Sequence, residues 1–296
     1  MNSADTIQVF DRPLVRERRT RAAADIEDYR FLFDEVADRL HERLCEIRRP
    51  FSDRLDLGAL NHPADPATQP LSGHDGLHVT ADITAAMPGA KLVLEEEMLP
   101  FRPGSFDLVV SNLMLHWVND LPGALIQIQR TLRPDGLFLA SMFGGDTLFE
   151  LRSSLMQAEE EISGGISPRI SPFADVRDLG GLLQRAGFAL PVSDSDTITV
   201  QYRDPFRLLA DLRGMGQTSA LIERNRRPLG RAIFMRAAEI YQQRFGQADG
   251  RVPATFQILY LTGWHPHDSQ QKPLKPGSAR TSLASALGSE EIKLKG

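Results

Sequence analysis

Acidic residues follow three short apolar segments of this chain, at positions where they could contact a nucleoside. Asp56-Leu57-Gly58 ends the first segment, Asp82 ends the second, and Glu95-Glu96-Glu97 follows the third. A glycine such as Gly58 lets the backbone approach a ligand, and an acid at the place of Asp82 can accept hydrogen bonds from both hydroxyls of a ribose. A carboxylate of the acidic run could accept a hydrogen bond from an adenine amino group.

Each of these acids also has a simpler explanation. Asp82 could cap the following helix, and an acidic run is more often a solvated turn. Only Gly58 represents the glycine-rich turn that usually surrounds such a ligand. Residues 61–74 contain Pro63, Pro66 and Pro70, which leave little room for a regular helix directly after the turn.

Strands and helices that alternate along the chain must position these acids. Leu108-Val109-Val110 is a short apolar run bounded by turn residues, as expected of a strand buried on both faces. A helix with one apolar stripe and a second apolar run over 137–143 follow, so the segment from Pro100 to Phe143 predicts a strand-helix-strand unit of a parallel sheet. The stripe consists of Leu121, Leu125, Ile128 and Leu132.

The periodicity of the remaining segments predicts the organisation of the chain. Apolar residues recur at three or four positions over 26–47, as in an amphipathic helix. The segments 197–202 and 256–264 predict two strands that pair antiparallel, with a helical insertion between them. We expect an N-terminal helical segment at 1–50, a sheet domain at 51–204, the insertion at 205–250, the last strand at 251–267 and a flexible tail at 268–296.

Composition excludes several classes of protein. The chain has 296 residues, 42% of them hydrophobic, and a net charge of -5, which argues against a general nucleic-acid binder. No apolar run approaches membrane-spanning length, and we expect no metal site. Cys45, the one cysteine, excludes an internal disulfide, and its apolar neighbours predict a buried structural thiol. The first residues lack a signal-peptide core and carry acids, which predicts a cytoplasmic or already processed protein.

Two further segments each leave two explanations open. The arginines near the N-terminus could bind an anionic partner or ligand, although a solvated helix face is the more frequent explanation. Residues 164–172 are rich in Gly, Ser and Pro, which indicates an irregular segment that is either a lid over a ligand or a plain connector. The arginines are Arg12, Arg16, Arg18, Arg19 and Arg21.

Several motifs together resemble a class I S-adenosylmethionine-dependent methyltransferase domain over roughly residues 50–145. More narrowly, the chain resembles, nearly from end to end, the methyltransferase-like assembly factors of respiratory complex I and their bacterial relatives. The general motifs are Asp56-Leu57-Gly58, Asp82, Leu99-Pro100-Phe101, residues 106–111 and Leu132-Arg133-Pro134-Asp135-Gly136. The narrower ones are Val9-Phe10-Asp11-Arg12, residues 115–122, residues 142–148, Ile170-Ser171-Pro172-Phe173 and Val252-Pro253-Ala254-Thr255.

The resemblance implies a seven-stranded Rossmann-like sheet with helices on both faces, and an S-adenosylmethionine pocket at the carboxyl ends of its strands. It also implies a partner among the subunits of respiratory complex I, in the bacterial cytoplasm or, in a eukaryote, the mitochondrial matrix. The cofactor-binding residues that it implies are Asp56 and Gly58 at the methionine end, Asp82 at the ribose, Glu95 near the adenine, and Ser111 and His116 on the loop after the fourth strand.

The chain departs from the family at the first motif, where Leu60 and His62 replace glycines. A bulky side chain at Leu60 removes close approach of the backbone and puts binding of the cofactor in question. The resemblance makes methyl transfer to a protein substrate the main hypothesis, with arginine hydroxylation on the same fold, or a non-catalytic assembly factor, as alternatives. For hydroxylation, His116 and Asp146 are the catalytic candidates.

Overall fold

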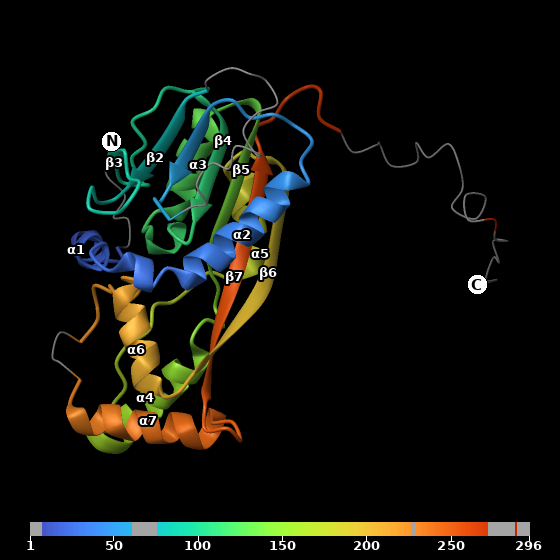
Figure 1. Cartoon of the computed structure of the whole chain (residues 1–296). Coiled ribbons are helices and arrows are strands. Elements are labelled where there is room, and N and C mark those ends of the chain that lie inside the picture. The colour runs from blue at the N-terminus through green and yellow to red at the C-terminus, as the bar shows by residue number, and fades with distance from the viewer. Residues whose placement is uncertain (1–7, 61–75, 226–228, 272–287, 289–296) are drawn as a thin grey trace. The chain divides into compact units, whose positions relative to one another are not determined.

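A mixed β-sheet forms the centre of the protein, in a computed structural model that describes residues 8–60, 76–225, 229–271 and 288. Its strands are β1 (Arg54–Leu57), β2 (His78–Asp82), β3 (Leu92–Val93), β4 (Phe106–Asn112), β5 (Leu132–Phe143), β6 (Ala189–Tyr202) and β7 (Val252–Trp264). Their order in the sheet is β3-β2-β1-β4-β5-β7-β6 (Figure 1). The strands from β3 to β5 pair in parallel, and β7 is antiparallel to both β5 and β6. The predicted seven-stranded α/β sheet is confirmed.

Helices cover both faces of this sheet. One face packs against α2, α4, α6 and α7, and the other packs against α3 and α5. Side chains alternate between the two cores along β4, where Leu108 and Val110 join one and Val109 joins the other, as in a strand buried on both faces. The helices are α1 (Arg12–Ala22), α2 (Phe31–Cys45), α3 (Leu121–Thr131), α4 (Phe149–Ser163), α5 (Val176–Arg185), α6 (Pro205–Gly214), α7 (Arg231–Phe245), and the short 3-10 turns η1 (Ile26–Asp28) and η2 (Leu115–Trp117).

The central strand-helix-strand unit follows the sequence closely. Asp120 caps α3 by accepting a hydrogen bond from the N–H of Gly123 at 2.9 Å, and the helix ends at Thr131. Pro134-Asp135-Gly136 lies inside β5, which already begins at Leu132. Asp135 adopts a φ of 65°, and the pairing with β4 shifts register between Phe106 and Leu108, so an irregularity in the ladder absorbs this segment.

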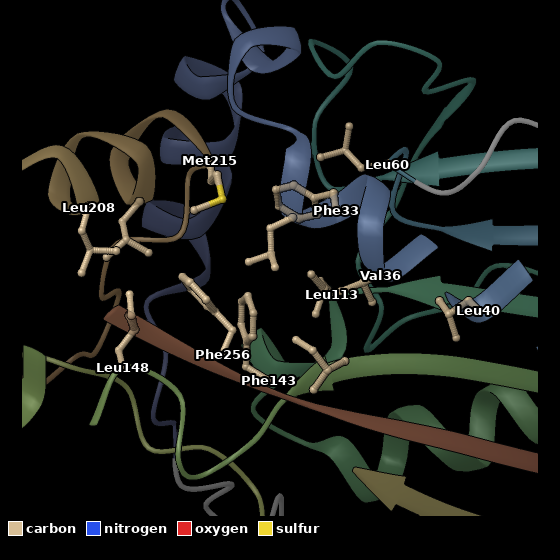
Figure 2. Close-up of a cluster of buried hydrophobic side chains, with 14 of the residues drawn as sticks. Phe33, Val36, Leu40, Leu60, Leu113, Phe143, Leu148, Leu208, Met215 and Phe256 are labelled. Carbon is tan, nitrogen blue, oxygen red and sulfur yellow. The ribbon is translucent and has the colours of Figure 1, made fainter. Parts of the chain in front are cut away.

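The helical insertion lies between two long paired strands. β6 and β7 pair from Ala189 opposite Trp264 to Tyr202 opposite Val252, and α6 and α7 separate them in the chain, as predicted. Figure 2 shows part of the core between the sheet and the helices α2, α4, α6 and α7, where Phe143 of β5 lies beside Phe256 of β7.

The described residues up to Pro266 form one compact unit, and the finer boundaries expected at 50, 204 and 250 stay predictions. The expected flexible tail at 268–296 lies mostly outside the described residues. The prediction of a buried thiol is wrong, because Cys45 is the last residue of α2 and is exposed. Among the described residues, no helix is long and apolar enough to cross a bilayer.

Candidate functional site

The carboxylate of Asp82, at the end of β2, is held by an arginine of the N-terminal helix. Nε of Arg19 lies 2.8 Å from Oδ1 and its Nη2 lies 2.7 Å from Oδ2, so the guanidinium donates two parallel hydrogen bonds. The backbone N–H groups of Ala59 and Thr84 donate to the same carboxylate at 2.9 and 3.3 Å. The side chains of the ion pair are 4% and 0% exposed. The oxygens predicted to meet a ribose already accept hydrogen bonds from the protein itself.

The acidic run after β3 pairs with two arginines of the same helix. Arg12 donates to Glu95 at 2.7 Å and also to Glu96, and Arg16 pairs with Glu95. Burial raises the pKa of the Glu96 carboxyl, and the charge of Arg12 partly offsets this effect. Burial also disfavours the charged form of Arg12, but Glu96 and Glu95 outweigh it and raise the pKa of the guanidinium. Arg12 therefore stays charged within the pair.

These contacts correct the prediction of a solvated arginine face. Arg12 and Arg19 are buried, and α1 lies against the carboxyl ends of β2 and β3 (Figure 1). Arg12 and Arg19 are seven residues apart and therefore share a helix face with Val15 and Ala22, which are also buried. The seven-residue spacing of the two arginines, together with the acids at the ends of nearby strands, was the sequence signal that could have predicted these buried ion pairs. The acidic run is likewise no solvated turn, because Glu96 is buried.

The motif Asp56-Leu57-Gly58 has the backbone turn that a glycine allows, but a side chain fills the space beside Gly58. Asp56 is buried, and its two oxygens contact Nε of Arg54 at 2.7 Å and Nε2 of His78 at 2.6 Å. Gly58 adopts a φ of 97°, which favours glycine. Met114 packs directly on Gly58, so that a Cβ at this position would collide with the methionine side chain. Nothing in the sequence indicated that Met114 takes this place.

Leu60 belongs to the core on the α2 face of the sheet. Its side chain is buried, and its carbonyl accepts a hydrogen bond at 2.8 Å from Nδ2 of Asn112, which also donates to the carbonyl of Phe33 in α2. Nearby on β4, the buried Oγ of Ser111 has no hydrogen-bond partner among the described residues. His62, the second replaced glycine, lies outside the described residues.

His116 is a buried, neutral histidine with one unpaired nitrogen. Its Nε2 lies 3.1 Å from Oε1 of Gln217, which also accepts from Nε1 of Trp117 at 3.1 Å. Because an amide oxygen only accepts, Nε2 carries the proton and Nδ1 is a bare acceptor. Nδ1 is buried without a partner among the described residues. Burial lowers the pKa of His116 to about 3, and nearby Arg19 and Arg12 contribute while the bond to Gln217 opposes the change.

Asp146, the residue proposed beside His116, does not share its environment. Asp146 is exposed, and its backbone N–H donates to Oε1 of Gln257 at 3.1 Å. Among the described residues, no contact joins its carboxylate to His116. A general acid–base pair needs hydrogen-bond reach, directly or through one water. The structure therefore offers no support for the two as a catalytic pair.

A cavity of about 630 Å³ opens beside His116. Trp117, Phe143, Phe173 and Gln217 line this cavity and also contact the His116 ring. Residues 168–171 form another part of the wall. The irregular segment, for which the sequence left a lid or a connector open, therefore lines a space large enough for a ligand. Trp117 follows β4 and Phe143 ends β5, which places the cavity at the carboxyl ends of the parallel strands, where open α/β sheets bind ligands.

Comparison with known proteins agrees with the observed fold and identifies the class of protein. Residues 79–140 match the family model described as a methyltransferase domain. A solved structure of Haemonchus contortus phosphoethanolamine N-methyltransferase 2 aligns with 86% of this chain and 59% of its own chain, with a TM-score of 0.50. At 14% sequence identity, this similarity shows the fold alone. The fold and the matched domain define a methyltransferase-domain protein of class I.

The similarity to curated proteins extends over almost the whole chain. The mitochondrial arginine-hydroxylase NDUFAF5 of Homo sapiens is 44% identical over 95% of this chain and 84% of its own length. That of Danio rerio is 42% identical over 96% and 91%. A malonyl-[acyl-carrier protein] O-methyltransferase of Halorhodospira halophila is 33% identical over 95% and 96%. The chain belongs to the NDUFAF5 family.

The fold implies S-adenosylmethionine, but the described side chains do not fit it. Arg19 forms an ion pair with Asp82, and Arg12 and Arg16 form ion pairs with Glu95, so these carboxylates already have partners within the protein. Met114 covers Gly58, where the backbone would approach the ligand. Roles in cofactor binding for Asp56, Gly58, Asp82, Glu95, Ser111 and His116 stay predictions.

Proposed function

We propose that this chain modifies an arginine of a protein substrate during the assembly of respiratory complex I. The observation that carries the proposal is the 42–44% identity to NDUFAF5 over 95–96% of the chain. This similarity includes the N-terminal helices and the insertion with α6 and α7, which the methyltransferase model at 79–140 does not cover. Because a fold alone hosts many functions, similarity outside the shared domain is the stronger support.

The proposed reaction is hydroxylation, which the name of these relatives states. It replaces one C–H bond of the arginine side chain by C–OH. Dioxygen supplies the oxygen atom, and an external two-electron reductant with two protons converts the other oxygen atom to water. Whichever groups perform this oxidation, His116 is neutral at physiological pH, because burial lowers its pKa to about 3. A neutral imidazole can accept a hydrogen bond at Nδ1 without first losing a proton.

Methyl transfer to the protein substrate is the second candidate. The methyltransferase domain at 79–140 and the O-methyltransferase relative favour it. It requires S-adenosylmethionine, whose expected contacts at Asp82 and Glu95 are taken by arginines of α1. The same occupied contacts favour the third candidate, an assembly factor that binds its partner and catalyses nothing.

Mass spectrometry of complex I distinguishes these candidates. Complex I is purified from cells with the gene, without it, and with the gene restored, and every arginine peptide is compared. We expect one arginine to carry an extra oxygen only when the gene is present. An extra methyl group instead supports methyl transfer, and unchanged peptides with impaired assembly support the non-catalytic factor. Equal complex I amounts and peptides in all cells would overturn the proposal. Fractionation of the same cells tests the proposed cytoplasmic or matrix location.

A further inference from the structure

The cavity beside His116 combines an apolar body with one cationic wall. Figure 2 shows Phe143, Leu148 and Phe256, which belong to its apolar side. Leucines of α4 and α6 extend this side, and its volume of about 630 Å³ lies within the range of small-molecule sites.

Within the part of the chain that the structure describes, three arginines line the cavity, and one of them forms no ion pair with a carboxylate. Arg224 pairs with Asp11 at 3.2 Å, and Arg169 pairs with Glu159 at 2.5 Å. Arg18 donates to the carbonyls of Thr218, at 2.7 Å, and Ser219, but no carboxylate among the described residues forms an ion pair with it. Its positive charge on this wall therefore lacks a direct ion-pair partner among these residues, and the charges of Glu17 and Asp11 offset it only in part.

The surroundings of Arg18 favour an anion. Burial lowers the pKa of its guanidinium, the neighbouring charge of Arg224 lowers it further, and Glu17 and Asp11 oppose the change only in part. A negative group beside Arg18 would reverse both effects, since an opposite charge stabilises the charged form. The Oγ of Ser219, on the same wall, is buried without a hydrogen-bond partner among the described residues and can donate to such a group.

We propose that this cavity binds an amphipathic carboxylate, with its alkyl chain against the apolar lining and its carboxylate at Arg18 and Ser219. Apolar walls accommodate the chain, and a guanidinium recognises a carboxylate with charge-assisted hydrogen bonds. An arginine side chain fits poorly, because the described lining residues supply three guanidinium groups against the single carboxylate of Asp11. This ligand is therefore distinct from the arginine substrate of the proposed function, and binding does not depend on that function.

Calorimetry with the full chain and dodecanoate tests the proposal. We expect saturable binding of dodecanoate, and at least tenfold weaker binding of dodecanol and of dodecyltrimethylammonium, which share the chain but lack the negative charge. Arg18→Gln should weaken dodecanoate roughly tenfold to a hundredfold, the range of a hydrogen bond to a charged group, and leave dodecanol unchanged. Arg21→Gln is the matched control, since Arg21 lies on the same helix but is exposed and pairs with Glu17.

Thermal unfolding of each variant establishes that it is folded before its binding is compared. Equal affinity for dodecanoate and dodecanol would overturn the proposal, as would an unchanged dodecanoate affinity in a folded Arg18→Gln variant. Dodecyl phosphate is the remaining probe, and a tenfold preference for it over dodecanoate would overturn the assignment to a carboxylate. Ser219→Ala should weaken dodecanoate by a smaller factor than Arg18→Gln, because it removes one neutral donor.

Discussion

Arg19 and Asp82 form a buried, bidentate ion pair between the N-terminal helix α1 and the end of β2, 63 residues later in the chain. Nη2 and Nε of the arginine lie 2.7 and 2.8 Å from the two carboxylate oxygens. The pair fastens α1 to the carboxyl edge of the sheet. It also engages the acid that the sequence assigned to the ribose of a nucleoside ligand.

Replacement of either partner should destabilise the fold strongly. Arg19→Met leaves Asp82 buried and unpaired, and Asp82→Asn leaves Arg19 in the same state; each should cost about 3–5 kcal/mol. Urea unfolding measures the loss. The double variant should lose clearly less than the sum of the two, because neither charge then remains alone.

An exposed pair on the same helix is the control. Arg21 pairs with Glu17 at 2.6 Å, but both side chains are mostly exposed. Arg21→Ala should therefore cost less than about 1 kcal/mol. If Arg19→Met were as mild as Arg21→Ala, the buried pair would have no structural role.

S-adenosylmethionine should bind the natural chain no better than millimolar. Arg19→Ala with Met114→Ala frees the Asp82 carboxylate and uncovers Gly58, so this double variant should bind the cofactor more tightly, as calorimetry can measure. Micromolar binding to the natural chain would show that α1 yields to the cofactor and would restore methyl transfer as the leading candidate. Leu60→Gly removes a buried side chain and should itself cost roughly 2–5 kcal/mol, so urea unfolding must show that this variant and the double variant are folded before their binding is compared.

The turn after β1 should tolerate no side chain at Gly58. With a φ of 97° and Met114 against it, Gly58→Ala combines backbone strain with a collision, and we expect a loss of about 1–3 kcal/mol or more in chemical unfolding. Gly145→Ala is the matched control, because nothing lies within 4 Å of its added Cβ. Adding Met114→Ala to Gly58→Ala should recover the part that comes from the collision.

Burial of His116 should make stability fall at acid pH. Its pKa is lowered from 6.5 to about 3, so the unfolded chain binds this proton between those values and the folded chain does not. Stability from this group is complete above pH 6.5 and decreases as pH falls toward 3, with a loss of about 2 kcal/mol between pH 7 and pH 5. The difference between the natural chain and His116→Gln in urea unfolding, measured at both values, isolates this contribution. Equal pH dependence of the two proteins would contradict the buried neutral state.

Hydrophobic patterning predicted most of the fold. The runs at 106–111 and 137–143 and the stripe from Leu121 to Leu132 are local signals, because the period of apolar residues follows directly from strand and helix geometry. The start of β6 at Ala189 gave no such signal, since much of this edge strand is exposed and its sequence does not need to alternate. The site was predicted less well, because the sequence indicated that Asp82 ends a strand but did not indicate that Arg19 is its partner.

The sequence by itself determined the order of strands and helices, the family, and the acids that end β2 and follow β3. Tertiary structure decided what those acids contact. Arg12 and Arg19 looked like members of a charged cluster, and only the docking of α1 against the sheet shows them buried against Glu96 and Asp82. Met114 likewise covers Gly58 only after β4 pairs with β1. Periodicity is a property of neighbours along the chain, whereas a buried ion pair depends on residues that folding brings together from far apart.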